Sequence, residues 1–320
     1  MLESIKMNSQ KKLSDFAKYA WFTLAFNIVV ILWGVFLRAS KSGDGCGKYW
    51  LTCKGEIIPS APELKTIIEF THRLMSGTDL LVVIGLVIWA FLKFRKSDQV
   101  RTFALISLFF IVTEALVGAG LVLTGNTAES LTAARPFWSV GHLINTFILL
   151  ASLSLTAWIA TSGIRVRLKG GEKLIPILAI ATVGIVLVGA SGSIAALSSM
   201  LFPANSILEG IQQDFSSASH GLLRLRISHP ILSIGVGVFL VFMAGRLKSQ
   251  SKATRWTKFF GNALIFLLII QVIFGALTLL TLAPILMQVG HLLLADLIWI
   301  SFILMSASFL SKSDDNNALK

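Results

Sequence analysis

Four of the five histidines in the chain recur at matched positions in its two halves. His72 corresponds to His229 at a separation of 157 residues, and His142 corresponds to His291 at a separation of 149 residues. Two imidazoles that face each other across a helix bundle are a usual way to bind a haem iron from both sides. The two pairs therefore predict two haem sites. His220 has no counterpart, and we expect it at the surface or at an interface.

Histidines in an apolar chain have other roles, and these remain open for any single one of the four. An isolated intramembrane histidine is often a hydrogen-bonded core residue, and proton relays also use histidine. A structural zinc ion takes four ligands, often with thiolates among them. The repetition of two pairs favours haem over each of these roles.

The repeat extends beyond the histidines themselves. Val140–Leu143 and Val289–Leu292 share one four-residue sequence, Val-Gly-His-Leu, around the second histidine of each half. Each half also carries four apolar segments, so both halves cross a membrane in the same direction. This predicts a parallel repeat about an axis along the membrane normal. Two further correspondences support the alignment: Glu114 with Gln271, and Gly118 with Gly275.

Acidic residues distinguish the first half from the second. Glu69 precedes His72 by three residues, about one helical turn, and its counterpart is Arg226. Glu114 likewise stands where the second half has Gln271. A carboxylate beside a haem can stabilise developing positive charge or move protons. The asymmetry predicts that the first half performs chemistry while the second half carries electrons.

Other charged residues lie close to the histidines or inside the apolar segments. Arg73, Arg224 and Arg226 could pair with haem propionates through charge-assisted hydrogen bonds, or could extend their charged ends to the membrane interface. Asp79 and Asp296 fall within apolar segments, where structural hydrogen bonding and proton transfer both remain open.

The only two cysteines, Cys46 and Cys53, fall in one predicted loop outside the membrane. An oxidising compartment allows such a pair to persist as a disulfide. The six intervening residues make a small loop that a disulfide can close. Free thiols or a metal-binding pair are the alternatives, and the location of the loop favours the disulfide.

Eight apolar segments must position these side chains. The chain is 55% hydrophobic and only 14% charged, whereas about 25% charged residues is usual in soluble domains. Each segment approaches the ~20 residues that cross a bilayer as a helix. We therefore predict an all-α integral membrane protein, built as two tandem, pseudo-twofold-related four-helix bundles of residues 1–162 and 163–320. The predicted membrane helices are 19–38, 71–92, 102–124, 137–161, 174–199, 228–246, 258–282 and 287–310.

Basic residues predict how the chain is oriented. Of the 28 Lys and Arg residues, nineteen fall in the tails and in the loops on one side, and nine fall on the other side together with seven acids. Basic loops stay in the cytoplasm, so we expect both termini there, in a bacterial inner membrane. The net charge of +12 therefore reports topology, and we expect no nucleic-acid partner. The first apolar segment lacks a small-residue cleavage pattern, so we expect it to remain as an anchor.

The order of these motifs resembles that of the haem A synthase family over nearly the whole chain. The stretch Glu69–Arg73 matches the Glu-x-x-His-Arg motif of the family, and His142, His229 and His291 lie where its other histidines are expected. Further stretches resemble the first outer loop and the end of the fifth helix of the family: Leu37–Ser40 followed by Ser42, Gly43, Cys46, Trp50 and Cys53, and Gly192–Leu197 followed by Phe202 and Pro203.

The resemblance implies oxidation of the C8 methyl group of haem O to a formyl group, which gives haem A. It implies that His72 and His142 bind the iron of the substrate haem, and that His229 and His291 bind a resident haem b. Glu69 would be the catalytic carboxylate, and Cys46 and Cys53 a disulfide near the substrate. Two residues depart from the family pattern: Pro230 follows His229 in place of arginine, and Glu114 replaces a neutral polar residue.

Candidate partners follow from this interpretation: haem O synthase (protohaem farnesyltransferase), a quinone or another electron acceptor, membrane lipid, and a second copy of the chain.

Two other functions compete with haem A synthesis. A dihaem cytochrome b that moves electrons between a quinol and a partner explains the four histidines but not the acidic, disulfide-bearing first half. A transporter built from repeats would need broken helices in both halves, and the sequence offers no paired Pro or Gly interruption.

Overall fold

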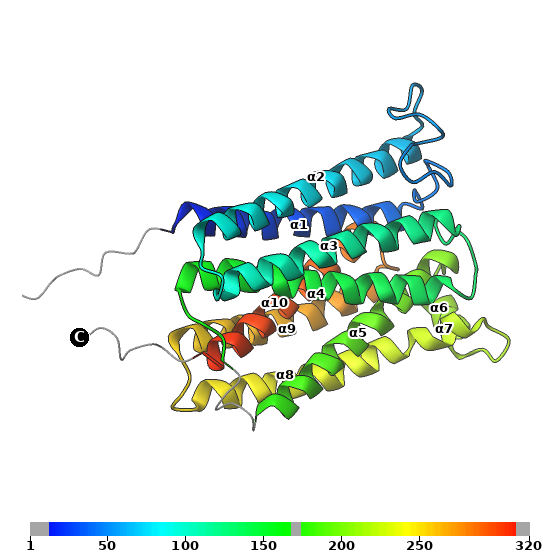
Figure 1. The fold of residues 1–320 in the computed structure, drawn as a ribbon. Helices are drawn as coiled ribbons and strands as arrows, with labels where there is room; N and C mark the ends of the chain where they lie inside the picture. The colour runs from blue at the N-terminus through cyan, green and yellow to red at the C-terminus, as the bar shows by residue number, and fades with distance from the viewer. Residues whose placement is uncertain (1–12, 168–173, 312–320) are drawn as a thin grey trace, which may run out of the picture.

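The computed structural model describes residues 13–167 and 174–311, and regular structure in these residues is helical apart from two isolated bridges. Figure 1 shows the long helices running side by side. They are α1 (Asp15–Ala39), α2 (Leu64–Lys93), α3 (Gln99–Leu123), α4 (Arg135–Ser162), α5 (Ile175–Leu201), α8 (Ser228–Ser249), α9 (Arg255–Leu280) and α10 (Ile285–Phe309). Two short helices, α6 (Ile207–Phe215) and α7 (Gly221–Arg226), lie between α5 and α8.

Local sequence signals set where these helices begin and end. The hydroxyl of Ser14 accepts from the N–H of Ala17 at the start of α1, and Thr254 does the same for Thr257 at the start of α9. Such caps satisfy N–H groups that have no partner inside the helix. Gly163 adopts a left-handed conformation with φ of 69° directly after α4, which glycine tolerates without a steric penalty.

The prediction of eight membrane helices is confirmed. Eight helices in the described part of the chain are long and apolar enough to cross a bilayer, with α7 and α8 counted as one continuous span. Most predicted boundaries agree to within four residues. The largest difference is at α2, which begins seven residues earlier than predicted, because a polar first turn extends the helix beyond its apolar segment. The short helices α6 and α7 were not predicted from hydropathy.

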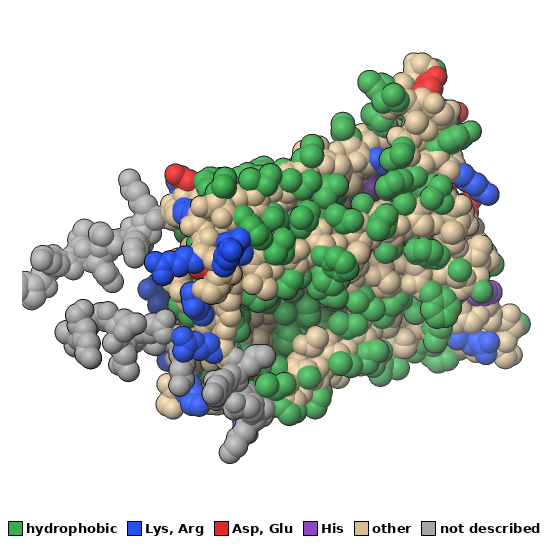
Figure 2. Space-filling model, in the orientation of Figure 1, with side chains coloured by type: hydrophobic (Ala, Val, Ile, Leu, Met, Phe, Trp, Pro, Cys, Tyr) green, Lys and Arg blue, Asp and Glu red, His purple; other side chains and the backbone are tan. Residues whose placement is uncertain are grey.

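Side-chain types divide the surface into zones. Figure 2 shows hydrophobic side chains along the length of the helices and many Lys and Arg side chains at the end where α1 begins and α10 ends. Large apolar side chains such as Phe109 and Phe242 are 62% and 74% exposed, which suits contact with lipid. Residues 1–12, 168–173 and 312–320, which include many of the basic residues that predict the cytoplasmic side, lie outside the described part.

Two helices form the centre of the molecule. Within their most apolar windows, α4 is 56% buried and α10 is 61% buried, whereas the other six spans are 11–33% buried. Helix α4 packs on α10 and α5, and α1 also packs on α10, so these contacts join the halves. The rings of Phe147 and Trp299 stack with centroids 5.1 Å apart, and the Trp299 indole N–H donates to the Phe147 carbonyl at 2.6 Å. The core is therefore continuous between the halves.

Contacts within each half follow the same order. In the first half α1 packs on α2 and α4, and α3 packs on α2 and α4; in the second half α5 packs on α8 and α10, and α9 packs on α8 and α10. Corresponding helices therefore have corresponding neighbours. The division into two bundles at residues 162 and 163 remains a prediction.

Candidate haem-binding site

The imidazole of His72 lies against a glycine of the neighbouring helix. The predicted helix 71–92 put His72 at the start of its helix. In the structure, His72 lies about two turns after the start of α2. A Cβ placed on Gly34 of α1 would lie 3.1 Å from Cε1 of this ring. The Nδ1 atom is buried and has no hydrogen-bond partner. Glycine at this position thus makes room for an imidazole that keeps a free ring nitrogen.

The second half repeats this arrangement on α5 and α8. A Cβ on Gly192 would lie 2.9 Å from Cε1 of His229. The hydroxyl of Ser191 lies 3.2 Å from Nδ1 of the same ring. A hydrogen bond at one ring nitrogen fixes the orientation of an imidazole and leaves the other nitrogen for a metal. Gly34 and Gly192 therefore occupy corresponding positions beside corresponding histidines.

The second-half histidines come together across the helices. The ring centroids of His229 and His291 are 6.2 Å apart, and their planes are inclined by 84°. An imidazole nitrogen binds a metal at about 2 Å, so two rings on opposite sides of one ion have centroids about 6 Å apart. The two rings are therefore neighbours, as the predicted pairing of His229 with His291 requires. The first-half pair, His72 and His142, is also close enough for electrostatic interaction.

The fourth-helix histidines each meet a polar residue from the third helix of their half. Nδ1 of His142 lies 3.3 Å from Oε1 of Glu114. In the second half, Nε2 of Gln271 lies 3.3 Å from Nε2 of His291 and donates to its carbonyl oxygen at 3.1 Å. A Cβ on Gly275 would lie 3.1 Å from Cε1 of His291. The alignment of Glu114 with Gln271 therefore describes a real spatial correspondence.

Glu69 is buried and both of its carboxylate oxygens are bound. Oε2 accepts from the backbone N–H of Cys46 at 2.8 Å, and Oε1 accepts from the Arg73 guanidinium at 2.5 Å. Only 3% of the residue is exposed. Glu69, which lies one turn before His72, thus ties the loop of residues 40–63 to α2.

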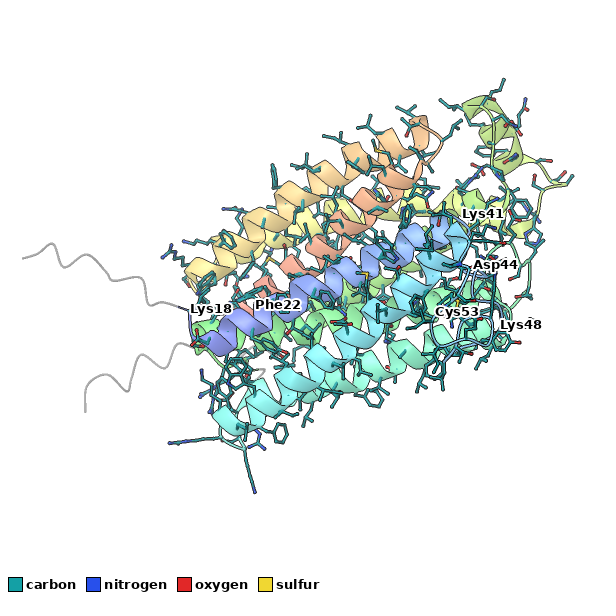
Figure 3. The ribbon with its side chains drawn as sticks, turned by 90° about the horizontal axis from the view of Figure 1, so that it is seen from above. Lys18, Phe22, Lys41, Asp44, Lys48 and Cys53 are labelled. Carbon is teal, nitrogen blue, oxygen red and sulfur yellow. A yellow bond between two sulfur atoms is a disulfide. The ribbon has the colours of Figure 1, made fainter. Side chains whose placement is uncertain are left out.

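The disulfide between Cys46 and Cys53 is confirmed, with a sulfur–sulfur distance of 2.02 Å. The loop it closes is docked onto the start of α2, where the Thr66 hydroxyl donates to the carbonyl of Gly45 at 2.8 Å. In Figure 3, Cys53 lies beyond the end of α1 that is opposite Lys18. The disulfide and Glu69 therefore both lie where this loop contacts the start of α2.

The structure provides protein partners for two arginines that we had considered for propionates. Arg73 donates to the carbonyl oxygens of Tyr49, Trp50 and Thr52, as well as to Glu69. In the second half, the guanidinium of Arg226 pairs with Asp214 at 2.6 Å. Arg224 is exposed. Carbonyls and carboxylates thus bind several N–H groups of Arg73 and Arg226, and pairing of these arginines with propionates remains a prediction.

A different arginine, Arg38, has no counterion among the residues that the structure describes. Nε of Arg38, near the outer end of α1, is buried without a hydrogen-bond partner. Arg135, 4% exposed, is near enough to repel it and donates only to carbonyls of the α3–α4 loop. Nearby, Lys41 pairs with Glu129 at 2.5 Å and lowers the pKa of that carboxyl. In residues 13–167 and 174–311, Nε of Arg38 therefore has no partner, and the nearest charge noted is that of another arginine.

An open groove of about 350 Å³ is lined by Gly141, the residue before His142 in the chain. It is lined by apolar side chains of α3 and α4 and by the amide of Asn145, and its other lining residues are Val117, Ala134, Phe137, Trp138 and Gly141. Asn145 also binds Glu114 at 2.5 Å. The polar network behind His142 therefore reaches the wall of a groove on the molecular surface.

The remaining residues noted in the sequence are Asp79, His220 and Asp296, and the first two have side-chain hydrogen bonds. The amide of Asn27 donates to Asp79 at 2.5 Å. His220 caps α7 by accepting from the N–H of Leu222 at 3.2 Å, and its ring stacks on Phe202, which agrees with an interfacial position. Asp296 is 1% exposed, and its Oδ2 has no hydrogen-bond partner.

Comparison with known proteins places this arrangement in a family. The family model described as cytochrome oxidase assembly protein, COX15-CtaA, matches residues 17–303. The chain belongs to this family. Relatives named Heme A synthase include proteins of Exiguobacterium sp., 37% identical over 113 residues, and of Halalkalibacterium halodurans, 35% identical over 127 residues. The resemblance to the haem A synthase family is therefore confirmed.

A longer alignment joins the chain to a protein of a different name. A relative from Thermus thermophilus named Protoheme IX farnesyltransferase is 41% identical over 299 residues, which is 93% of this chain but 49% of that protein. The chain thus spans about half the length of this relative. The two Heme A synthase alignments cover 35% and 40% of this chain, and 36% and 42% of those proteins.

Proposed function

We propose that this COX15-CtaA chain is a haem A synthase, which oxidises the C8 methyl group of haem O to a formyl group. The observation that carries the proposal is the repeated histidine arrangement. In each half, the second helix presents a histidine against a glycine of the first helix, and the fourth helix presents a histidine against a polar residue of the third. The relatives named Heme A synthase support the choice of reaction.

The residues present suit haem as the bound group. A porphyrin supplies four ligands to iron, so the protein needs to add only the two axial ones. Among the described residues, no group of three or more His, Cys, Asp or Glu could hold a bare metal ion, and the histidines come in pairs. We propose that His72 and His142 hold the substrate haem, and that His229 and His291 hold a resident haem b, which would carry electrons.

Residues near the first pair would bind and orient the substrate. Haem O carries two propionates, and the unpartnered guanidinium of Arg38 is a suitable donor for a carboxylate. Glu69 is the candidate catalytic carboxylate, held one turn from His72 by Cys46 and Arg73. A carboxylate in this position would stabilise positive charge at the porphyrin edge. With water as the source of oxygen, the conversion of the methyl to the formyl group would release four protons and four electrons, which an external electron acceptor such as a quinone would take up.

Pigment analysis tests the proposal against a dihaem cytochrome b, which would use the same four histidines. The full chain is expressed in cells that make haem O but no haem A, and its haems are extracted and separated by mass. Haem A, or haem O hydroxylated at C8, is the expected product. Recovery of haem b and unchanged haem O alone, from protein with a bis-histidine spectrum, would instead favour the cytochrome.

We further propose a haem O-forming farnesyltransferase as a membrane partner. The Thermus thermophilus protein carries that name, aligns with nearly all of this chain and is about twice as long. A direct contact would pass a poorly soluble haem between sites within the membrane. Co-purification of a tagged farnesyltransferase with this chain from detergent tests the contact, with an unrelated eight-helix membrane protein as the control. Equal recovery of both would argue against it. A second copy of the chain and a quinone acceptor remain predictions.

A further inference from the structure

Glu114 lies directly behind the first-half histidine that faces the substrate site. Its Oε1 is 3.3 Å from Nδ1 of His142, and the two residues come from adjacent helices, α3 and α4. If Nδ1 carries the hydrogen of the ring, Nε2 is left to face an iron. A carboxylate at this distance favours positive charge on the ring and so raises the basicity of the ligand.

The surroundings of Glu114 are built for a carboxylate. Nδ2 of Asn145 donates to Oε2 at 2.5 Å, and the Thr146 hydroxyl is 2.5 Å from Oε1. The orientation of Asn145 is itself fixed, because Nδ2 also donates to the carbonyl of Phe110 at 2.8 Å. An amide in place of Glu114 would direct its NH₂ group toward one of these donors. Donors from two side chains therefore bind the two oxygens of Glu114, and the His142 ring lies 3.3 Å from one of these oxygens.

The second half lacks this construction. Gln271 replaces Glu114, and the positions of Asn145 and Thr146 are taken by Leu294 and Ala295. Gln271 presents a neutral amide to His291, whichever of its ends faces the ring. A buried carboxylate without donors is costly inside a membrane. The first half thus provides donors for a charge, and the second half provides neither the charge nor the donors.

We propose that Glu114 is a positioning residue that makes His142 an electron-rich axial ligand, so that the first-half haem is held in its oxidised state more strongly than the second-half haem. This inference rests on the proposed function, because it assigns His142 to the substrate iron. A negative charge 3.3 Å from the ring of an axial imidazole favours ferric over ferrous iron, since the ferric state carries one more positive charge. The neutral Gln271 gives no such bias.

A redox titration isolates the effect on the first-half site. His229 and His291 are both replaced by alanine to remove second-half ligation, and the full chain is loaded with haem b as the probe. Glu114→Gln in this background should leave the haem content unchanged and raise the midpoint potential. A tenfold change in the ferric-to-ferrous equilibrium corresponds to about 59 mV for one electron, and we expect a shift of about this size.

The mirror variant Gln271→Glu, combined with Leu294→Asn and Ala295→Thr in the otherwise unaltered chain, should lower the potential of the second-half haem.

If the double-alanine background does not fold, the Glu114→Gln comparison is made in the full chain as a two-component titration. Only the component that appears on adding haem O should then move. Bound haem whose potential is the same with Glu or Gln at position 114 would overturn the inference and leave the proposed function standing. Failure of folded protein to bind haem at His72 and His142 would overturn both.

Discussion

At the residue scale, a glycine lies against three of the four histidine rings, whereas Gly118, the counterpart of Gly275, meets nothing within 4 Å. Glycines make room for the rings of His72, His229 and His291, at 2.9–3.1 Å from a hypothetical Cβ. The charged carboxylates Glu69 and Glu114 lie only in the first half. Equivalent backbone geometry with unequal charge is what we expect of two haem sites with different tasks.

Glu69→Gln should retain the fold and both haem sites while haem A formation falls by about 10²-fold, the size of effect usual for loss of an acid–base or charge-stabilising group. Glutamine can still accept from the Cys46 N–H, so the loop should stay docked. Arg73→Gln is the matched control, because it removes the same ion pair from the other side. Conversion is measured by haem extraction and haem content by absorption. An equal loss in the Arg73 variant would show that Glu69 acts by anchoring the loop alone.

Gly192→Ala should disturb the second-half haem without unfolding the chain. The new Cβ would lie 2.9 Å from His229, so the ring must move, whereas alanine is itself about 1 kcal/mol better than glycine in a helix. The expected result is a lower content, or an altered spin state, of the b-type haem at an unchanged melting temperature. Gly245→Ala, which meets nothing within 4 Å, should leave the spectrum as it is. A normal spectrum from the Gly192 variant would contradict the packing of the ring on α5.

At the element scale, the loop of residues 40–63, which we call the cap, is bound to the start of α2. Its disulfide, the Thr66–Gly45 hydrogen bond and the Glu69–Cys46 hydrogen bond are independent attachments. Four carbonyl and carboxylate partners also occupy Arg73. The cap is therefore fixed by several interactions of which the disulfide is one.

Replacing Cys46 and Cys53 with serine should accordingly reduce haem A formation more than it reduces stability. A disulfide that closes so short a loop stabilises by about 2–3 kcal/mol at most, and the backbone N–H of residue 46 still reaches Glu69. We expect the variant to keep its b-type haem spectrum and its elution volume, with conversion lowered several-fold. Haem extraction and size-exclusion chromatography measure the two properties. Loss of the folded protein with both serines present would mean that the disulfide holds the bundle, and full activity would mean that the cap has no role in the reaction.

At the scale of the whole molecule, α4 and α10 bring the two halves together. Each carries one of the proposed iron ligands, and both are more than half buried. The Phe147–Trp299 stack lies on the same two helices, closer to the middle of each than the histidines. The two proposed haem sites therefore share a rigid central pair of helices.

Single alanine variants of the four histidines should separate into two classes. Replacement of His229 or His291 should remove the resident b-type signal or change its spin state, since loss of one axial ligand opens an iron site. Replacement of His72 or His142 should abolish haem A formation and leave that signal in place. Redox titration and pyridine haemochrome analysis distinguish the classes. Loss of the stable haem b in the His72 variant but not in the His229 variant would reverse the assignment of the halves, and four unaltered spectra would exclude haem ligation.

The sequence by itself determined the membrane helices, the disulfide and the family. Apolar runs, the cysteine pair and the Glu-x-x-His-Arg motif are properties of neighbouring residues, so they can be read along the chain. Only the tertiary structure decided which groups meet across helices. It gave Arg73 and Arg226 protein partners, left Arg38 without one, and brought Glu114 to His142. These contacts depend on how each helix is rotated and which helices are adjacent, and packing between distant segments fixes both.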